Sequence, residues 1–294
     1  MNILVIGSSN TDMTALVPSI PGPGETVVGS GYRVTLGGKG ANQAVACARQ
    51  GARVTFITAL GNDSLAQDHL ASFKKEGIDT SFIARKPVHT GVALIFVDQN
   101  GENSIGVAAG ANDMLSPSDI DAADGCFREG DILLLQLEIP SETVLYAARK
   151  AKERKMKVIL NPAPVRNIPR ELFSCTDIIT PNRHELAALG IAPEKLFEMG
   201  TEYLITTLGA EGVKLVSSGE SYIVPAYKVR PVDTVGAGDC FNGAFAASLA
   251  MGYDIRASLE RAVAAAAIAV TKEGAQAAMP TARETELFIQ NNSI

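Results

Sequence analysis

Short apolar runs alternate along the sequence with segments of helical character. Six of these runs are apolar on both faces: "ILVIG" (3–7), "VTFITALG" (54–61), "DILLLQL" (131–137), "KVILN" (157–161), "DIIT" (177–180) and "YLITT" (203–207). Continuous hydrophobicity of this kind is typical of parallel strands that are covered by helices on both sides. We therefore expect an α/β fold with a mostly parallel central sheet between two layers of helices.

Punctuation residues between the runs support this alternation. Ser116-Pro117 and Ser141 are typical helix starts, and glycines are expected just past helix ends at Gly51, Gly77, Gly190, Gly252 and Gly274. Residues 212–225 have the pattern of a hairpin, so the sheet should end in antiparallel strands.

Two regions break the alternation. Residues 12–36, with "PSIPGPGE", and residues 90–108, with "VDQNGEN", have the pattern of strands and turns without helices. We expect them to form a small β-sheet lid. The main α/β domain would then comprise residues 1–11, 37–89 and 109–294.

Composition excludes several classes of protein. The net charge is -6, and the chain has no basic cluster beyond 148–157, so we expect no nucleic-acid partner. The longest uninterrupted apolar run, 262–270, is far short of the roughly 20 residues of a membrane span, and we expect a cytoplasmic protein. The cysteines form no C-x-x-C pair and are expected to be buried and reduced: Cys47, Cys126, Cys175 and Cys240.

Several familiar site motifs are absent. The first strand leads into "GSSN" and not G-x-G-x-x-G, and no P-loop or G-x-S-x-G occurs. His184-Glu185 lacks the second histidine of a zinc-protease motif.

The segment "DTVGAGDCFNGAF" (233–245) places glycines just ahead of an apolar run with helical spacing, so a helix should begin near Ala237 or Gly238. The backbone N–H groups of Gly236, Ala237 and Gly238 could then bind an anion. Asp239 beside them is placed to accept a proton from a hydroxyl, an arrangement that fits a kinase. Alternatively, Asp239 caps the helix and the glycines only form a turn.

A second glycine cluster, "GGKGANQA" (37–44), also opens a helix, which we expect over 41–50. Together the two segments resemble the signatures of the ribokinase-like (phosphofructokinase B) family of sugar kinases. Further segments are similar to the family in the same order: "GSSNTD" (7–12), "GVALIFVDQNGEN" (91–103), "QLE" (136–138), "NPAP" (161–164), "TPNRHE" (180–185), "TLGAEG" (207–212) and "AAAAIAVTKEGAQ" (264–276). The resemblance covers nearly the whole chain and implies a three-layer ribokinase-like fold.

The resemblance also implies a sugar site. It assigns substrate contacts to Asn10, Asp12, Gly38, Lys39, Asn42, Glu138 and Asp239. Carboxylates and amides suit the paired donors and acceptors of sugar hydroxyls. Taken singly, Asp12 also fits a turn and Lys39 a surface charge.

For the nucleotide, the resemblance implies ATP contacts at Asn182, Thr207, Leu208, Gly209, Ala210, Glu211, Gly212 and Gly238. The resemblance also implies that Glu185 organises Mg²⁺ through water. Asn182 could instead simply cap the following helix. Val263 stands where a polar residue often lies beside adenine.

The family also implies a monovalent cation, usually potassium. Its matching positions are Asp233, Val235, Ala269, Lys272 and Gly274. Ala278 departs from the family, which often has a serine there to complete this site. Cys240 follows the proposed base and could be a reactive thiol, although a packing role is the simpler interpretation.

Taken together, the resemblance implies ATP-dependent phosphorylation of D-ribose at O5 to D-ribose 5-phosphate, with Asp239 as the base. It also implies a homodimer through the lid. The alternatives are a 2-deoxyribokinase, another sugar or nucleoside kinase of the family, and a non-catalytic sugar or nucleotide sensor.

Overall fold

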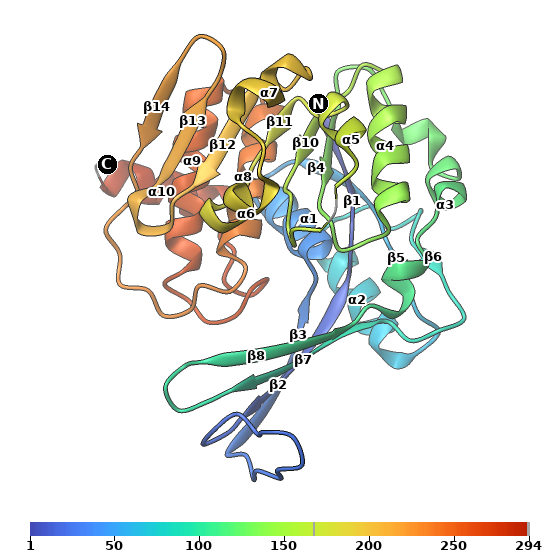
Figure 1. The fold of residues 1–294 in the computed structure, drawn as a ribbon, viewed down its shortest axis with the longest axis vertical. Coiled ribbons are helices and arrows are strands. Elements are labelled where there is room, and N and C mark those ends of the chain that lie inside the picture. Colours follow the sequence, from blue (N-terminus) through green and yellow to red (C-terminus); the bar gives the residue numbers. More distant parts are fainter. Residues whose placement is uncertain (167, 293–294) are drawn as a thin grey trace.

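The computed structural model describes residues 1–166 and 168–292 and places a large twisted sheet between two layers of helices (Figure 1). In spatial order its strands are β14 (Ser221–Val224), β13 (Val213–Val216), β12 (Tyr203–Thr207), β11 (Ile178–Ile179), β10 (Lys157–Leu160), β9 (Ile132–Leu135), β1 (Asn2–Ile6) and β4 (Arg53–Ile57). All neighbours from β4 to β12 are parallel, and β13 and β14 are antiparallel. The predicted α/β class and the terminal hairpin are both confirmed.

Burial on both faces explains why the strand segments lack polar alternation. In β1, Ile3 and Val5 pack into the core on one side of the sheet, whereas Leu4 and Ile6 pack into the core on the other. Side chains alternate between faces along a strand, so both sets must be apolar. A sheet covered on both sides therefore lies in the middle of the fold.

One helical layer consists of α1 (Lys39–Arg49), α2 (Ser64–Lys75), α8 (Ala237–Ala250), α9 (Ile255–Ala269) and α10 (Ala282–Asn291). The other consists of α3 (Pro117–Asp121), α4 (Ser141–Glu153), α5 (Arg170–Ser174), α6 (Arg183–Leu189) and α7 (Pro193–Glu198). Short 3-10 turns lie at η1 (Gly110–Met114), η2 (Asp124–Cys126) and η3 (Gly209–Glu211).

The helix boundaries mostly follow the predicted signals, although α1 begins at Lys39, two residues before the predicted start, and ends at Arg49. Ser116 and Asp119 form a capping box at the start of α3, and Gly190 ends α6 in the left-handed conformation, with φ of 60°. Gly274 does not follow a helix end directly, because α9 already ends at Ala269. Its N–H instead donates to Asp233 at 2.9 Å, so this glycine belongs to a loop contact.

A second sheet projects from the main body (Figure 1). Its order is β3 (Gly31–Gly37), β2 (Asn10–Leu16), β7 (Gly91–Val97) and β8 (Asn103–Ala108), with β2 and β7 parallel. These strands extend beyond the predicted limits to include residues 10, 11 and 37. The sheet continues from the carboxyl end of β1, which puts it beside the edge where the parallel strands end. That it acts as a lid stays a prediction. A two-stranded sheet, β5 (Ala59–Leu60) and β6 (Ala84–Arg85), completes the fold.

All four cysteines are free, but only Cys47 and Cys240 are buried, whereas Cys126 and Cys175 are half-buried. The expectation of buried thiols thus holds for two of them. Within residues 1–166 and 168–292, every helix is too short or too polar to cross a membrane.

Helices α1 and α8 pack unusually close at Gly243. A Cβ on Gly243 would lie 2.4 Å from Cβ of Ala46 and 2.7 Å from the carbonyl oxygen of Gln43. The two helices can approach this closely only because residue 243 has no side chain.

We expect Gly243→Ala to lower the free energy of unfolding by about 1–3 kcal/mol, because the added methyl must push α1 and α8 apart. Urea denaturation measures the effect. Gly125→Ala is the matched control, since a Cβ on Gly125 meets nothing within 4 Å. Equal stability of the two variants would contradict the packing argument.

Candidate active site

The first turn of α8 presents a buried carboxylate at the carboxyl edge of the sheet. Gly236 caps the helix with φ of 74°, and a Cβ there would lie 2.8 Å from Cβ of Ala275. Both the conformation and the space therefore require glycine. Asp239 follows in the first turn and is only 6% exposed. The predicted helix start is correct.

Two amides from α1 hold this carboxylate. Asn42 Nδ2 donates to Asp239 Oδ2 at 2.9 Å, and Gln43 Nε2 donates to Oδ1 at 3.0 Å. Gln43 is itself held, because its Nε2 also donates to Asn161 Oδ1 and its Oε1 accepts from Gln136 Nε2. Each carboxylate oxygen thus receives an N–H, and Asp239 is fixed in one orientation. This is more than a helix-capping role requires.

Charged groups gather next to Asp239. The Asp239 carboxylate raises the pKa of Lys39, burial opposes this effect, and Glu138 and Glu185 add to it. Burial, followed by the charges of Glu138 and Asp239, raises the pKa of Asp12 to about 7. The structure therefore brings the predicted residues Asp12, Lys39, Glu138 and Asp239 into one electrostatic cluster.

Glu138 and Asn10 are each tied to the protein through one oxygen. Glu138 Oε2 accepts from the Lys39 backbone N–H at 3.0 Å and from the Ser8 hydroxyl. Asn10 Oδ1 accepts from Asn112 Nδ2 at 2.8 Å, so the Asn10 amide nitrogen is left to donate to a ligand.

Gly38 sits where these elements meet. It begins α1 with φ of 89°, and a Cβ on it would lie 2.6 Å from the backbone nitrogen of Asn10. The glycine lets the start of α1 approach β2 closely, which places Lys39 near the residues of that strand.

A cavity of about 330 Å³ opens beside the start of α8. Five predicted nucleotide positions line it: Thr207, Gly209, Ala210, Gly212 and Gly238. Val263 also lines the cavity. The other residues that line the cavity are largely small or apolar: Val213, Ala226, Tyr227, Val229, Pro231, Thr234, Ala237, Phe241, Ala266, Ala267 and Val270. Such walls suit a flat ring system.

Three predicted nucleotide residues do not line this cavity. Leu208 N–H donates to the Gly212 carbonyl, and Glu211 pairs with Arg183 at 2.6 Å. Asn182 caps α6 and forms a capping box with Glu185, as its alternative interpretation proposed. It also bridges to Thr207 and so lies at the edge of the nucleotide loop.

Glu185 uses only one oxygen in that capping box, because Asn182 N–H donates to Oε2 at 2.8 Å. The pKa of Glu185 is raised, chiefly because the carboxyl group is partly buried, although the hydrogen bond from Asn182 and the charge of Lys39 oppose this shift. A half-buried carboxylate with a second oxygen to offer fits Mg²⁺ bound through water.

Asp233 joins two loops beside the start of α8. Its Oδ1 accepts from Val235 N–H and its Oδ2 from Gly274 N–H, both at 2.9 Å. The Ala269 carbonyl accepts from Lys272 N–H at 3.1 Å, and Ala278 is buried nearby in the chain. The loops that carry the five predicted cation positions are therefore in contact, and their carbonyl oxygens and single carboxylate suit a hard cation.

The predicted anion-binding amides are not equivalent. Ala237 N–H donates to the Thr234 carbonyl at 3.2 Å, which closes the turn before the helix. Gly236 and Gly238 are therefore the better placed donors for an anion at this helix start.

Several site residues were not singled out from the sequence. Gln43, Gln136 and Asn161 lie inside the quoted motifs, but only the fold shows that they support Asp239. Asn112 and the cavity wall at 226–231 carry no motif. For Gln43, what the sequence could not reveal is the close approach of α1 to α8, which brings its amide to Asp239.

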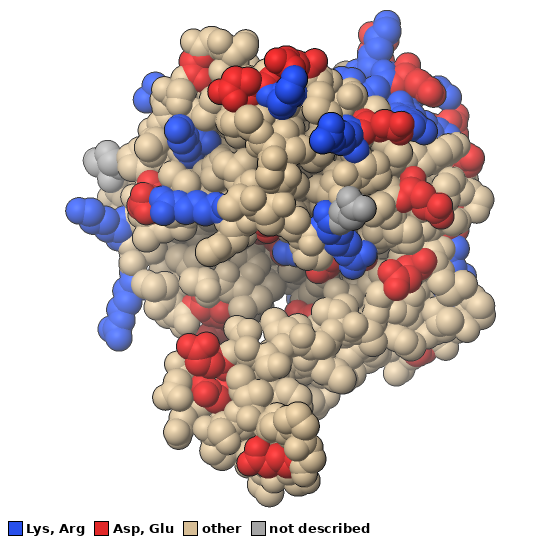
Figure 2. All heavy atoms as spheres, viewed as in Figure 1, with Lys and Arg blue, Asp and Glu red and all other residues tan. Residues whose placement is uncertain are grey.

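Figure 2 shows the site from outside as a hollow between the main body and the projecting sheet, with charged atoms on its walls. On this face the projecting sheet is mostly tan, and the charged side chains visible on it are acidic.

Comparison with known proteins agrees with this geometry. Residues 1–282 match the model of the pfkB family of carbohydrate kinases. The chain belongs to this family.

Relatives cover the chain almost from end to end. It is 42% identical to a ribokinase of Haemophilus influenzae, with 98% of each chain covered. Its fold is similar to the crystal structure of ribokinase from Thermotoga maritima, with a TM-score of 0.92, 40% identity and 99% of each chain covered. It is also similar to Arabidopsis thaliana ribokinase complexed with ribose and ATP, with a TM-score of 0.88, 29% identity and 98% of each chain covered. The three-layer fold of the family is confirmed.

The raised pKa of Asp12 has a consequence for stability. A carboxyl group with a pKa of 3.8 in the unfolded chain and about 7 in the fold keeps its proton in the folded state between these values. The stabilisation that this carboxyl group contributes to the fold is fully present below pH 4 and is lost as the pH rises through 7.

We therefore expect the free energy of unfolding to fall by about 1–3 kcal/mol between pH 5 and pH 8, and Asp12→Asn to remove most of this fall. Urea denaturation at several pH values measures it. The same slope in the variant as in the parent would show that another group is responsible.

Proposed function

We propose that this carbohydrate kinase phosphorylates D-ribose at O5, with ATP as the donor, to give D-ribose 5-phosphate. The observation that carries the proposal is the buried Asp239 carboxylate, which two amides fix in one orientation and which directly follows Gly238 in the wall of the 330 Å³ cavity. The similarity to ribokinases, one of them complexed with ribose and ATP, supports these substrates.

The sugar would lie in the hollow below the start of α8. Asp12 and Glu138 would accept hydrogen bonds from its hydroxyls, while Asn10 and Lys39 would donate. Asn42 would donate one N–H to Asp239 and have a second for the sugar. Gly38 would allow the close approach of the ligand.

ATP would occupy the cavity beside α8, with its base against the apolar wall at Val263 and its phosphates near Gly209, Gly212 and Gly238. This orientation points the γ-phosphate toward Asp239. Leu208, Ala210 and Glu211 belong to the same loop as Gly209 and Gly212 and would also lie near ATP. Asn182 and Thr207 would lie at the edge of this loop.

In the reaction, Asp239 takes the proton of O5 as this oxygen attacks the γ-phosphorus, and the bond to the ADP oxygen breaks. The amides of Gly236 and Gly238 would stabilise charge on the transferring group, whereas the Ala237 N–H already donates to the Thr234 carbonyl. Lys39 balances the carboxylates around it. Most of the catalytic effect would come from positioning and electrostatics.

Two metal ions complete the proposal. Glu185 would hold Mg²⁺ through water, where the ion supplies positive charge to the phosphates. Asp233, with backbone oxygens of Val235, Ala269, Lys272 and Gly274, would hold a monovalent cation, which we propose is K⁺. Ala278 would leave the cation site without a serine hydroxyl.

A homodimer through the projecting sheet is also part of the proposal. On one face of this sheet Tyr32, Val34, Leu94 and Phe96 are 67%, 48%, 53% and 37% exposed. Strand registers place all four on the same side, next to Met13 and Ala15. A second copy of the chain would cover this apolar face.

We expect Asp239→Asn to lower kcat for D-ribose by about 10²- to 10⁴-fold, because the amide cannot accept the proton, while KM for ATP stays within about threefold. ADP formation measures the rate. Asp254→Asn is the control, since Asp254 caps α9 away from the site and asparagine caps as well. A folded Asp239→Asn variant within threefold of the parent would disprove the role of Asp239.

The same assay with a panel of substrates tests the choice of sugar. D-ribose should be preferred over 2-deoxy-D-ribose, other pentoses and nucleosides. A preference for another member of the panel would identify a different kinase of the family. Binding of sugar without ADP formation would indicate a sensor.

We expect the parent to be a dimer and Leu94→Lys to be a monomer, because the charge cannot be buried between two apolar faces. Light scattering after size-exclusion chromatography measures the mass. Ile223→Lys, on the edge strand β14 and similarly exposed, should remain a dimer. A dimeric Leu94→Lys variant would place the interface elsewhere.

A further inference from the structure

We infer that Gln276 is a positioning residue, which holds the Asn42 side chain in the one orientation that lets it donate to Asp239. Gln276 donates to Asn42, and Asn42 donates to Asp239, so Gln276 acts on the carboxylate through Asn42. The inference rests on the proposed function only in taking Asp239 as the base.

The chemistry of the contacts fixes the direction of the chain of hydrogen bonds. An ionised carboxylate can only accept, so Asn42 must turn its Nδ2 toward Asp239 Oδ2. Its Oδ1 then points the other way, where Gln276 Nε2 donates to it at 3.1 Å. Asp239, Asn42 and Gln276 are 6%, 6% and 7% exposed, so water has little access to replace these bonds.

Reversal of the Asn42 amide would break both bonds at once. Its oxygen would face the Asp239 carboxylate, and its NH₂ would face the NH₂ of Gln276. Mismatched polar groups are costly when buried, because neither is satisfied by solvent. Without Gln276, only Asp239 would select between the two orientations.

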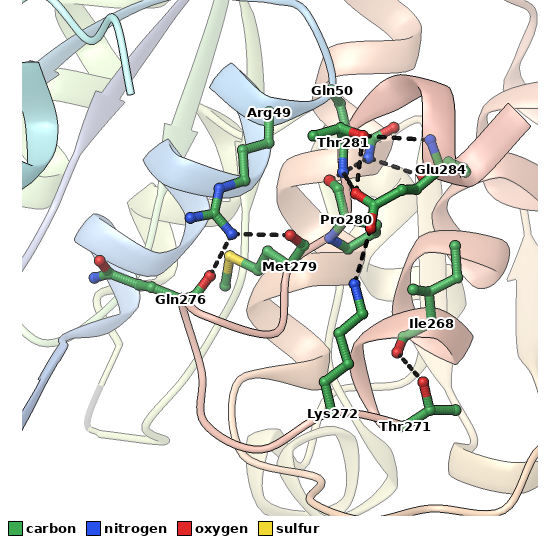
Figure 3. A network of polar contacts seen from close by, with 11 residues as sticks. Arg49, Gln50, Ile268, Thr271, Lys272, Gln276, Met279, Pro280, Thr281 and Glu284 are labelled. Atoms are coloured by element: carbon green, nitrogen blue, oxygen red, sulfur yellow. Dashed lines mark hydrogen bonds and ion pairs between the residues drawn. The ribbon is translucent and has the colours of Figure 1, made fainter. Parts of the chain in front are cut away.

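Gln276 is well held despite lying in the loop after α9. Figure 3 shows Arg49 reaching from α1 to this loop, where its Nη1 donates to the carbonyl oxygens of Gln276 at 2.6 Å and Met279 at 2.9 Å. The Nε and Nη2 edge of the same guanidinium is in turn paired with both carboxylate oxygens of Glu76. The loop is thus anchored to α1, the helix that also carries Asn42.

Gln50 makes a second contact from the end of α1 to the same loop. Its Nε2 donates to the Pro280 carbonyl and to Thr285 Oγ1, both at 2.9 Å. Like Gln276 it is buried, but its side chain contacts Pro280 and Thr285 and not Asn42 or Asp239. It therefore serves as an internal control for the fold of the loop.

The test is Gln276→Glu, which keeps the shape of the side chain but replaces the donor with an acceptor. We expect kcat for D-ribose to fall at least tenfold, with KM for ATP within about threefold of the parent. Gln276→Leu removes the donor without adding a charge and should lower kcat in the same way. Gln50→Glu should lower the melting temperature but leave kcat within twofold.

A second readout does not need activity. Because Gln43 donates to Oδ1, Asp239→Asn would direct its new NH₂ toward Asn42. Asn42 could then reverse, accept from residue 239 and donate to the carboxylate introduced by Gln276→Glu. The double variant should therefore lose less in melting temperature than the sum of the two single losses, by ~2 °C or more.

The outcomes separate the two proposals. If the parent is active and both Gln276 variants keep kcat within twofold, the inference is wrong. Additive melting-temperature losses in the double variant would also overturn it. If the parent shows no kinase activity with D-ribose, the proposed function fails, and the melting temperatures alone decide the role of Gln276.

Discussion

The close contact between α1 and α8 is the constraint on which the site depends. Asn42 and Gln43 come from one helix and Asp239 from the other, and all three lie in the first turns, next to the carboxyl edge of the sheet. Gly243 permits the approach, and interiors packed at this density leave little freedom for the helices to shift. The orientation of one carboxylate is thereby determined by the packing of two whole helices.

Electrostatics adds a second constraint. Burial and the nearby charges of Glu138 and Asp239 raise the pKa of Asp12, and the charge of Asp239 raises the pKa of Lys39. A cluster of this kind costs stability when empty, because several partly buried charges share few partners. Functional sites often concentrate such perturbed groups, and the hollow beneath α8 is consistent with that pattern.

The fold was largely predictable from the sequence because its signals are local. Strands buried on both faces must be apolar throughout, as β1 is, and the start of α8 is marked by Gly236 and the helical spacing that follows. The prediction that Gly274 directly follows a helix end was wrong, because a glycine that a loop requires cannot be distinguished in the sequence from one that ends a helix. The limits of the projecting sheet were also too narrow.

The site was predictable only in part, for a physical reason. The resemblance to a family supplied the candidate residues around Asp12 and Asp239, but the residues that hold them depend on contacts between distant segments. Gln276 is separated from Asn42 by most of the chain, and Asn112 from Asn10 by about a third of it. No local pattern reports such pairs, since an amide reveals its partner only after the helices have packed.

Strand β2 belongs both to the proposed sugar site and to the projecting sheet. It carries Asn10 and Asp12 and is also an inner strand of the projecting sheet, hydrogen-bonded to β3 and β7 along its length. Any swing of that sheet must carry the two side chains with it. Under the proposed function, selectivity and access could therefore not evolve independently, because a substitution that changes the sugar site at Asp12 would also change an inner strand of the proposed lid.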